Sequence, residues 1–224
     1  PNTKRVAMVT HTNDWAKAYC DPAIKVIKES GGEIIEELAL ERGQTDATAQ
    51  VLRLKKANPD FILGCLYEAE TVIFLRDAKK YSVRIPVMGT AGTDLENTLE
   101  RLGDLDDVKD FYVLNDFVDK VDGPKMKKWN DIILKYNPNE TITGFSAVSM
   151  ASGVAAVEAR RAVGRDLTRS KFIAELENIR NLTTGILACD MTWTPTDRHG
   201  CKKSAVAGFI NGQPTVLSSW GKPW

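Results

Sequence analysis

The sequence predicts an α/β fold, in which helices cover both faces of a doubly wound parallel sheet. Short apolar runs rich in branched side chains alternate along the chain with longer segments whose apolar residues recur at helical spacing. Hydrophobic residues make up 43% of the 224 residues, which is an ordinary share for a globular protein. Strands that alternate with helices of this length are typical of βαβ units, and such units form a parallel sheet.

The pattern begins with residues 4–10 (KRVAMVT), an apolar run that we predict as a buried strand. A helix follows behind Asp14 and ends at Gly31-Gly32, because glycine is typical of helix C-termini. The same alternation of strands and helices continues along the first half of the chain. The predicted strands are residues 4–10, 33–40, 60–66, 85–89 and 108–114, and the predicted helices are residues 16–30, 47–57, 68–81 and 94–102.

The pattern changes after Asp116, where three predicted helices follow one another before any further strand. The helices are residues 125–136, 143–163 and 171–179, and the strands that follow them are residues 185–194, 205–210 and 215–218. Asn211-Gly212, between the last two strands, is a strong signal for a β-hairpin turn.

The helices of this second half need another layer to cover their apolar stripes. Either they stack on each other, or the strands beneath them are missing from this chain, and we expect the second. The chain starts directly at a predicted core strand, without initiator Met or signal peptide, which agrees with a missing N-terminal part. The apolar faces that we expect to lack a cover are Val148, Ala151 and Ala155 on one helix and Phe172, Ile173 and Leu176 on the next.

Charge and cysteine spacing exclude several classes of partner. Thirty Lys and Arg balance thirty Asp and Glu, so the net charge is zero and the chain lacks the basic footprint of a nucleic-acid-binding protein. The four cysteines form no CxxC pair, so a zinc site is not indicated. We expect no cofactor and no metal.

The motifs of common enzymes are also missing. The loop after the first strand contains no GxGxxG, and no GxxxxGK[ST] occurs in the chain. Gly144-Phe145-Ser146 resembles the start of a nucleophile elbow, but the second glycine of that motif is absent. His199 lies in a segment that is typical of a turn. We therefore predict a protein that is not an enzyme.

Parallel sheets bind ligands at the carboxyl ends of their strands, so the loops at residues 11–15, 66–70, 90–94 and 115–119 are the candidates. Trp15 follows the first strand and Tyr67 follows the third, and two aromatic rings at one edge suit a small organic ligand. The alternative for Trp15 is an anchor at the helix start that packs on the sheet.

His11 and Asn13 lie in the same loop as Trp15 and are further candidates for contact with a ligand. For His11, a local hydrogen bond to the loop backbone is the favoured alternative.

Several segments match a known family in the same order along the chain. They are KRVAMVT with Trp15 behind it, GGEIIEE, TDATAQVLRLKKANPDFILGCLY, RIPVMGTAG, ITGFSAVSMASGVAAVEARRAVG, LTRSKFIAELENIRNLTTGILACDMTWTPTDRHG and AVAGFINGQPTVLSSW. Together they resemble the type I periplasmic binding proteins, in the leucine/isoleucine/valine-binding branch, and the resemblance covers nearly the whole chain. The resemblance implies two lobes that close on a ligand like a hinge.

The resemblance also implies a domain organisation. Residues 1–116 are expected to form the sheet domain of the second lobe, residues 117–187 the helical return to an incomplete first lobe, and residues 188–224 the strands that return to the second lobe. The implied function is that of an extracytoplasmic, periplasmic receptor that delivers a small molecule to an ABC permease. The alternative is a ligand-sensing domain of a receptor or regulator with the same fold.

The family's pocket can be carried over to single positions. Trp15 and Tyr67 match the aromatic residues that cover the ligand, and Phe145 matches the aromatic residue at the start of a helix near the hinge. Ala91 stands where members that bind amino acids commonly have a carboxylate for the ligand's ammonium group. The expected ligand is thus an amino acid, an amide or an aromatic or other organic acid, and Ala91 favours one that is not an ordinary α-amino acid, unless Asp94 takes over the role of the acid. For Asp94 a helix N-cap is the favoured role.

Two further expectations concern cysteines and association. Cys189 and Cys201 flank a loop between predicted strands, which leaves open a hairpin disulfide or two free thiols. Cys20 and Cys65 are as well explained by buried thiols as by a disulfide. We also expect the chain to associate through its uncovered helices, or to stay bound to a cleaved N-terminal piece.

Overall fold

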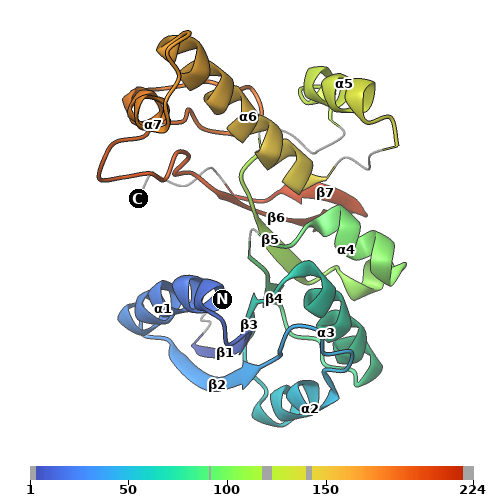
Figure 1. Ribbon diagram of the computed structural model, residues 1–224. Helices are drawn as coiled ribbons and strands as arrows, with labels where there is room; N and C mark the ends of the chain where they lie inside the picture. Colours follow the sequence, from blue (N-terminus) through green and yellow to red (C-terminus); the bar gives the residue numbers. More distant parts are fainter. Residues whose placement is uncertain (1–3, 91, 118–122, 140–142, 219–224) are drawn as a thin grey trace. The chain divides into compact units, whose positions relative to one another are not determined.

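A computed structural model describes residues 4–90, 92–117, 123–139 and 143–218 (Figure 1). The chain divides into two compact units. Unit one consists of Pro1–Leu114 and Val206–Leu217, and unit two of Asn115–Ala205 and Ser218–Trp224. The sequence places the boundaries after residues 116 and 187, whereas the contacts divide the chain after residues 114, 205 and 217.

Unit one is built on a mixed sheet of seven strands in the order β2-β1-β3-β4-β5-β6-β7. The first five strands pair in parallel, and β6 and β7 form an antiparallel hairpin at one edge. The strands are β1 (Arg5–Thr10), β2 (Glu33–Ala39), β3 (Phe61–Cys65), β4 (Val87–Met88), β5 (Phe111–Asn115), β6 (Ala205–Ile210) and β7 (Gln213–Val216). The predicted doubly wound α/β fold is therefore confirmed for this unit.

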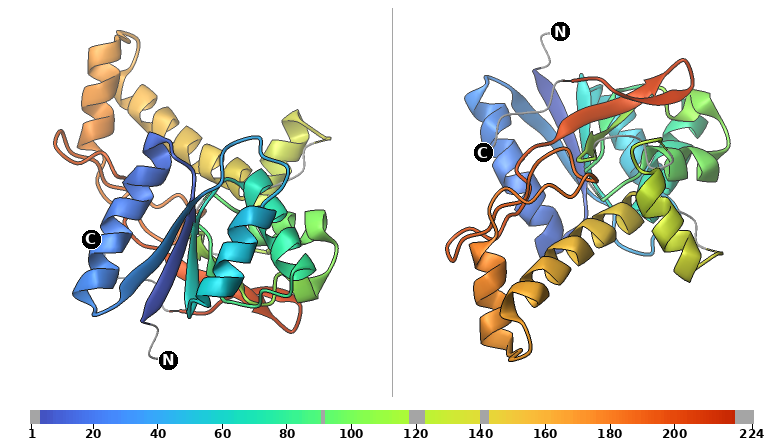
Figure 2. Two further views of the ribbon diagram at one scale, coloured as in Figure 1. Left: turned by 90° about the horizontal axis from the view of Figure 1, so that it is seen from below. Right: turned by 90° about the horizontal axis from the view of Figure 1, so that it is seen from above.

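The helices of unit one cover both faces of the sheet, as Figures 1 and 2 show. Because side chains alternate along a strand, neighbouring residues of β1 enter different cores. Ala7 and Val9 belong to the larger core, which α2 and α3 cover, whereas Met8 belongs to a smaller core under α1. These helices are α1 (Asp14–Glu29), α2 (Thr48–Ala57), α3 (Glu68–Lys80) and α4 (Leu95–Leu102), and a short 3₁₀ turn, η1 (Leu105–Asp107), precedes β5.

The N-caps of α1 and α4 are polar side chains close to the predicted positions, whereas α2 begins at Ala47 without a side-chain cap. Asp94 accepts a hydrogen bond from the backbone N–H of Asn97, so the N-cap role favoured for it is confirmed. In α1 the cap is Asn13 rather than Asp14, because the side-chain oxygen of Asn13 accepts from the N–H of Ala16 at 2.9 Å. The side-chain oxygen of Asn13, which we predicted to contact a ligand, thus caps α1 instead.

The hairpin of β6 and β7 turns at Asn211-Gly212 as predicted. Both residues have positive φ, at 50° and 75°, which is the backbone of a type I′ turn. Ile210 pairs with Gln213 across this turn.

Unit two contains α5 (Lys127–Tyr136), α6 (Gly144–Val163) and α7 (Arg169–Asn178). Thr143 and Ser146 form a capping box at the start of α6. Figure 2 shows α7 folded back beside the C-terminal part of α6, and the two helices are in contact. Along α6 every fourth residue is a buried alanine: Ala147, Ala151, Ala155 and Ala159.

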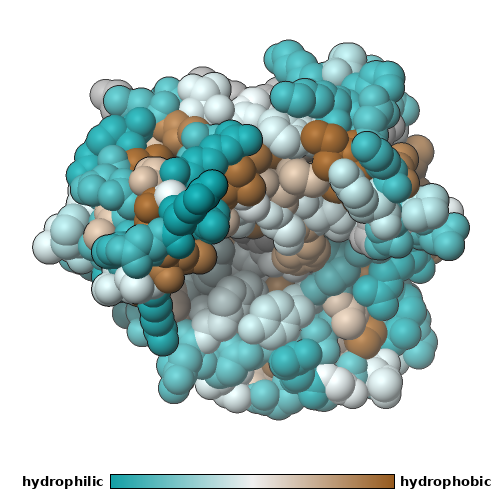
Figure 3. All heavy atoms as spheres, turned by 45° about the horizontal axis from the view of Figure 1, so that its top comes forward, coloured by the Kyte–Doolittle hydropathy of each residue, from teal (hydrophilic) through white to brown (hydrophobic). Residues whose placement is uncertain are grey.

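The expectation that the apolar face of α6 lacks a cover is therefore wrong for Ala151 and Ala155, which are 1% and 3% exposed. Ala151 lies in a core with Met126 and Ile186, so a neighbouring segment of unit two supplies the layer that we assigned to missing strands. Val148 is 43% exposed, as expected. Figure 3 shows hydrophobic residues, in brown, at the surface between hydrophilic ones.

The predicted strand at residues 185–194 is wrong. Within it only isolated bridges occur, from Leu187 to Phe117 and from Met191 to Leu182. Gly185 has a φ of 72°, and the hydroxyl of Thr184 accepts hydrogen bonds from the N–H groups of Ile186 and Leu187. This local turn takes the donors that a strand would need for its ladder.

The disulfide between Cys189 and Cys201 is present, with the Cα atoms 5.8 Å apart. It joins two ends of an irregular loop rather than the arms of a hairpin, because the first predicted strand is absent. Cys20 and Cys65 are buried free thiols.

Candidate functional site

The strand order of unit one creates a switch point beside β1. The chain runs from β1 to β2 on one side and then crosses to β3 on the other, so the loops that follow β1 and β3 leave the sheet in different directions. A crevice at such a point, outside the carboxyl ends of the strands, is where open parallel sheets bind ligands. Trp15 lies in the first turn of α1, and Tyr67 is the residue before α3.

Trp15 and Tyr67 meet at this edge. Their rings stack with centroids 4.3 Å apart and planes 25° apart, and both side chains are half-buried. Tyr19, one turn further along α1, extends the cluster at 5.2 Å from Trp15. A Cβ atom at Gly92 would come within 3.1 Å of the indole of Trp15, so the loop after β4 approaches the ring through a residue without a side chain. The aromatic pair therefore lies between three carboxyl-end loops.

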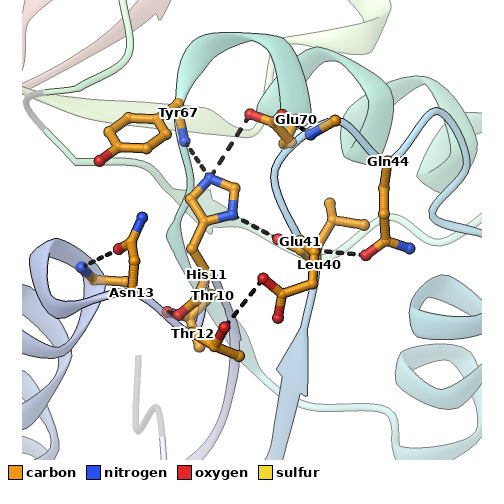
Figure 4. A network of polar contacts seen from close by, with 11 residues as sticks. Thr10, His11, Thr12, Asn13, Leu40, Glu41, Gln44, Tyr67 and Glu70 are labelled. Atoms are coloured by element: carbon orange, nitrogen blue, oxygen red, sulfur yellow. Dashed lines mark hydrogen bonds and ion pairs between the residues drawn. The ribbon is translucent and has the colours of Figure 1, made fainter.

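His11 connects the same loops through its ring (Figure 4). Its Nδ1 lies 2.6 Å from the carbonyl oxygen of Leu40, and its Nε2 lies 3.1 Å from the backbone nitrogen of Tyr67. Because the N–H of Tyr67 donates to Nε2, the ring proton is on Nδ1, which donates to Leu40. His11 thus bonds to backbone groups, as its alternative role requires, but these belong to two other loops and not to its own. Its role here is to hold Tyr67 against the ends of β1 and β2.

Glu70 holds the loop after β2 from the other side. Its carboxylate accepts from the N–H of Gly43 at 2.8 Å, while its second oxygen is 3.7 Å from Nε2 of His11, beyond hydrogen-bond distance. Glu70 as a whole is 5% exposed. The loop that it fixes carries Arg42, whose guanidinium lies 5.2 Å from the centroid of the Tyr67 ring. Arg42 thus brings a positive charge to the aromatic pair.

Glu68 lies beside Tyr67 and binds the start of α4. Its carboxylate accepts from the backbone N–H of Asp94 at 2.8 Å and from the hydroxyl of Thr98 at 2.7 Å. Burial raises the pKa of Glu68, and the two hydrogen bonds offset this effect only in part. Three acids near this edge are therefore engaged within the fold, Glu68 with α4, Asp94 as the cap of α4 and Glu70 with the loop after β2.

The structure brings together three of the predicted site residues, His11, Trp15 and Tyr67. Asn13 lies in the same loop but caps α1, and Ala91 is outside the described residues. Phe145 belongs to unit two, at the start of α6, and is 53% exposed.

Sequence reasoning named the loops that contain Gly92, Glu68 and Glu70 but none of these residues by itself, and it missed Arg42 altogether. The rule that selects carboxyl-end loops would have found Arg42, because it follows the second strand directly, but we did not include that loop. Nothing in the local sequence showed that the loop after β4 touches Trp15.

Within the ranges that the structure describes, no three His, Cys, Asp or Glu side chains come together as a metal site. Across the same residues, no helix combines the length and the apolar character that a membrane crossing requires.

The sequence profile of a family described as Periplasmic binding protein matches residues 1–213. The chain belongs to this family. The resemblance read from the sequence is thereby confirmed, and the family is one of binding proteins rather than enzymes.

Solved structures show the same fold as this periplasmic binding protein. A branched chain amino acid ABC transporter from Thermus thermophilus with bound valine has a TM-score of 0.87 at 18% identity, covering 98% of this chain and 60% of that one. A leucine binding protein from Thermotoga maritima has a TM-score of 0.80 at 19% identity, covering 96% and 60%. An extracellular ligand-binding receptor from Rhodopseudomonas palustris has a TM-score of 0.81 at 15% identity, covering 96% and 63%.

This periplasmic binding protein chain thus spans about 60% of the length of the structures that it matches. The search of curated proteins found no match.

Proposed function

We propose that the chain is part of an extracytoplasmic receptor that captures a small organic molecule for an ABC importer of the branched-chain amino acid type. The observation that carries this proposal is the stacked pair of Trp15 and Tyr67 at the switch point of the sheet. The pair offers apolar ring surface to a ligand, and the surrounding loops offer polar groups. Family membership supports a periplasmic location and a permease as the partner.

In our proposal, the part of the receptor that this chain does not span supplies the remaining wall of the pocket. The receptor would close around its ligand by a hinge motion of two lobes. Phe145 is proposed to join the pocket near that hinge, in line with its position in the family pattern. The chain alone should then bind the ligand more weakly than the whole receptor.

The charges at the edge favour a ligand with a carboxylate or amide group over an ordinary α-amino acid. Ala91 stands where the family commonly has an acid for the ammonium group, and an ammonium group that is buried without a partner is costly. Glu68 and Asp94 are already bound within the fold. Arg42 adds a positive charge beside Tyr67, which suits an anionic group.

Isothermal calorimetry on the complete receptor tests this function. The panel would contain leucine and valine, their amides, and aromatic and aliphatic carboxylic acids. We expect acids or amides to bind more tightly than the amino acids. Tight binding of leucine or valine would contradict the proposed ligand class, and the absence of binding across the panel would contradict the receptor function.

Variants then test the site itself. Trp15→Ala or Tyr67→Ala should weaken binding by about 1–3 kcal/mol, roughly 5- to 150-fold in Kd, with folding nearly intact. Trp15→Phe and Tyr67→Phe keep a ring and serve as matched controls. Arg42→Gln should weaken the binding of acids more than the binding of amides. Unchanged affinity in the Trp15→Ala/Tyr67→Ala double variant would reject this location for the ligand.

A further inference from the structure

Two buried thiols lie directly behind the aromatic pair. Cys20 is on α1, and Cys65 is the last residue of β3. Both are free cysteines, 6% and 1% exposed, and both belong to the small core under α1 together with Met8 and Ala16. The binding function proposed above makes no use of them.

The sheet register brings the two sulfur atoms together. Cys65 pairs with Thr10 of the neighbouring parallel strand, so their side chains stand on the same face of the sheet, with the strands about 4.8 Å apart. The thiol of Cys20 reaches this pair from α1 and donates to the hydroxyl of Thr10 at 3.4 Å. Cys20 and Cys65 also belong to the same small core under α1. Two cysteines on packed elements thus lie on either side of the same threonine, within one core.

We propose that Cys20 and Cys65 are a site of reversible disulfide formation, which links α1 covalently to the carboxyl end of β3. The chain already holds one disulfide, Cys189–Cys201, so it tolerates an oxidising compartment. The family's periplasmic setting agrees with this.

The oxidant would be a small-molecule disulfide. The thiolate of Cys20 attacks one sulfur of the oxidant, forms a mixed disulfide and releases one thiolate of the oxidant. Cys65 then loses its proton and attacks the sulfur of Cys20, which releases the second thiolate. In sum, two thiols of the protein lose two electrons and two protons, and one disulfide of the oxidant is reduced to two thiols.

The environment assigns these two roles. The neighbouring thiol of Cys65 outweighs burial and lowers the pKa of Cys20 to about 7. The thiol of Cys20, together with burial, raises the pKa of Cys65. Cys20 is therefore the attacking thiolate, and Cys65 is the resolving thiol that stays protonated until the mixed disulfide forms.

The bond would tie together the elements that carry the aromatic pair. Trp15 and Cys20 lie on the same helix, and Cys65 lies two residues before Tyr67. Oxidation would then limit the movement of α1 relative to the loop after β3, whether or not a ligand binds there.

The test uses the chain with Cys189→Ser and Cys201→Ser, which leaves Cys20 and Cys65 as the only cysteines. The folded variant, checked by circular dichroism, is incubated with oxidised glutathione, quenched with acid, unfolded, alkylated with N-ethylmaleimide and weighed by mass spectrometry. We expect a change from two alkylated cysteines to none, without a glutathione adduct, and a return to two after dithiothreitol. Adding Cys65→Ser should instead trap Cys20 as a glutathione adduct.

The unchanged chain provides the same answer if the double variant does not fold. Peptide mapping without reduction should then show a fragment with Cys20 linked to a fragment with Cys65 after treatment with oxidised glutathione. Two alkylated cysteines at every ratio of oxidised to reduced glutathione would overturn the proposal. A separate glutathione adduct on each cysteine would overturn it as well.

Discussion

At the scale of single residues, His11 shows how a side chain can serve a site without facing a ligand. The ring is 2% exposed and bonds to backbone groups on both sides. Its Nδ1–H satisfies a carbonyl at the end of β2, and its Nε2 satisfies the N–H of Tyr67. A buried backbone group that loses such a partner costs about 1–3 kcal/mol. His11 therefore contributes to the stability of unit one and to the position of Tyr67.

We predict that His11→Ala lowers the free energy of unfolding by about 2–4 kcal/mol, because it leaves two backbone groups without their partner. Urea unfolding followed by circular dichroism measures this change. Thr12→Ala, in the same loop, removes an exposed hydrogen bond to Glu41 and should change stability by less than about 0.5 kcal/mol. Equal effects of the two variants would show that the bonds of His11 add nothing to stability.

Glu68 leads to a prediction on pH. Its pKa is raised in the folded protein, chiefly by burial, while in the unfolded chain it has its ordinary value. Between these two values the folded protein binds more protons than the unfolded chain, so this group lowers the unfolding free energy as pH rises through that window. Glu68→Gln removes the titration, since the amide stays neutral and can still accept from the N–H of Asp94.

We therefore expect the unfolding free energy of the native chain, relative to Glu68→Gln, to fall as the pH rises from the ordinary pKa of a glutamate carboxyl group through the raised pKa of Glu68 in the folded protein. Denaturant midpoints at several pH values measure the difference. Glu100→Gln, on the exposed side of α4, is the control and should give a flat difference. A flat difference for Glu68→Gln as well would show that burial does not raise the pKa of this carboxyl group.

At the scale of elements, the start of α4 occupies two acids near the site with hydrogen bonds. Its first turn is capped by Asp94 and is held from outside by Glu68. Both interactions satisfy N–H groups that a helix start leaves without partners. The eight residues of α4 thus engage two carboxylates that would otherwise be the natural partners of an ammonium group.

We predict that Asp94→Asn leaves both stability and ligand affinity nearly unchanged, because asparagine is also a good N-cap. Asp94→Ala should cost about 1 kcal/mol in unfolding free energy and likewise leave affinity unchanged. Thermal unfolding and calorimetry on the complete receptor measure the two quantities. If Asp94→Asn selectively abolished the binding of a ligand with an ammonium group, Asp94 would be a ligand contact instead.

At the scale of the whole molecule, unit two retains apolar surface among its described residues. Phe145, Val148, Val157 and Leu167 are each between 43% and 53% exposed. A cavity of about 350 Å³ lies between α6, α7 and Trp193, and it is lined by Phe172, Ile173 and Leu176. Apolar residues in such number at a surface are typical of an interface.

We predict that the purified 224-residue chain associates, so that light scattering gives a mass above 24.8 kDa. The driving force is the removal of apolar surface from water, about 25 cal/mol per Å². Val148→Ser together with Val157→Ser should weaken this association, whereas Val26→Ser, at an exposed position of α1, is the control. A monomer for the unchanged chain at all concentrations would show that this surface is stable in water.

The sequence by itself determined the alternation of strands and helices, because side-chain periodicity and caps are local properties. The first strand, the hairpin at Asn211-Gly212 and the N-cap at Asp94 all followed from residues close together in the chain. The placement of Trp15 and Tyr67 after two strands followed as well, since the carboxyl ends of parallel strands share an edge. The disulfide Cys189–Cys201 was left open by its spacing, and the helix α6 was predicted to lack a cover that unit two in fact supplies.

Only the tertiary structure decided which of these loops meet. The order β2-β1-β3-β4 puts Arg42 over Tyr67 and Gly92 against Trp15, and it brings Cys65 to Cys20 through Thr10. Strand order depends on which faces bury each other over long sequence distances, and local periodicity carries no information on this. The same holds for residues 185–194, whose composition suits a strand but in which the N–H groups of Ile186 and Leu187 bind Thr184. Local sequence pattern thus predicted most of the strands and helices and the sheet edge at which Trp15 and Tyr67 lie. Burial between segments far apart in the sequence decided which loops lie side by side at that edge, and therefore which charged side chains reach the aromatic pair.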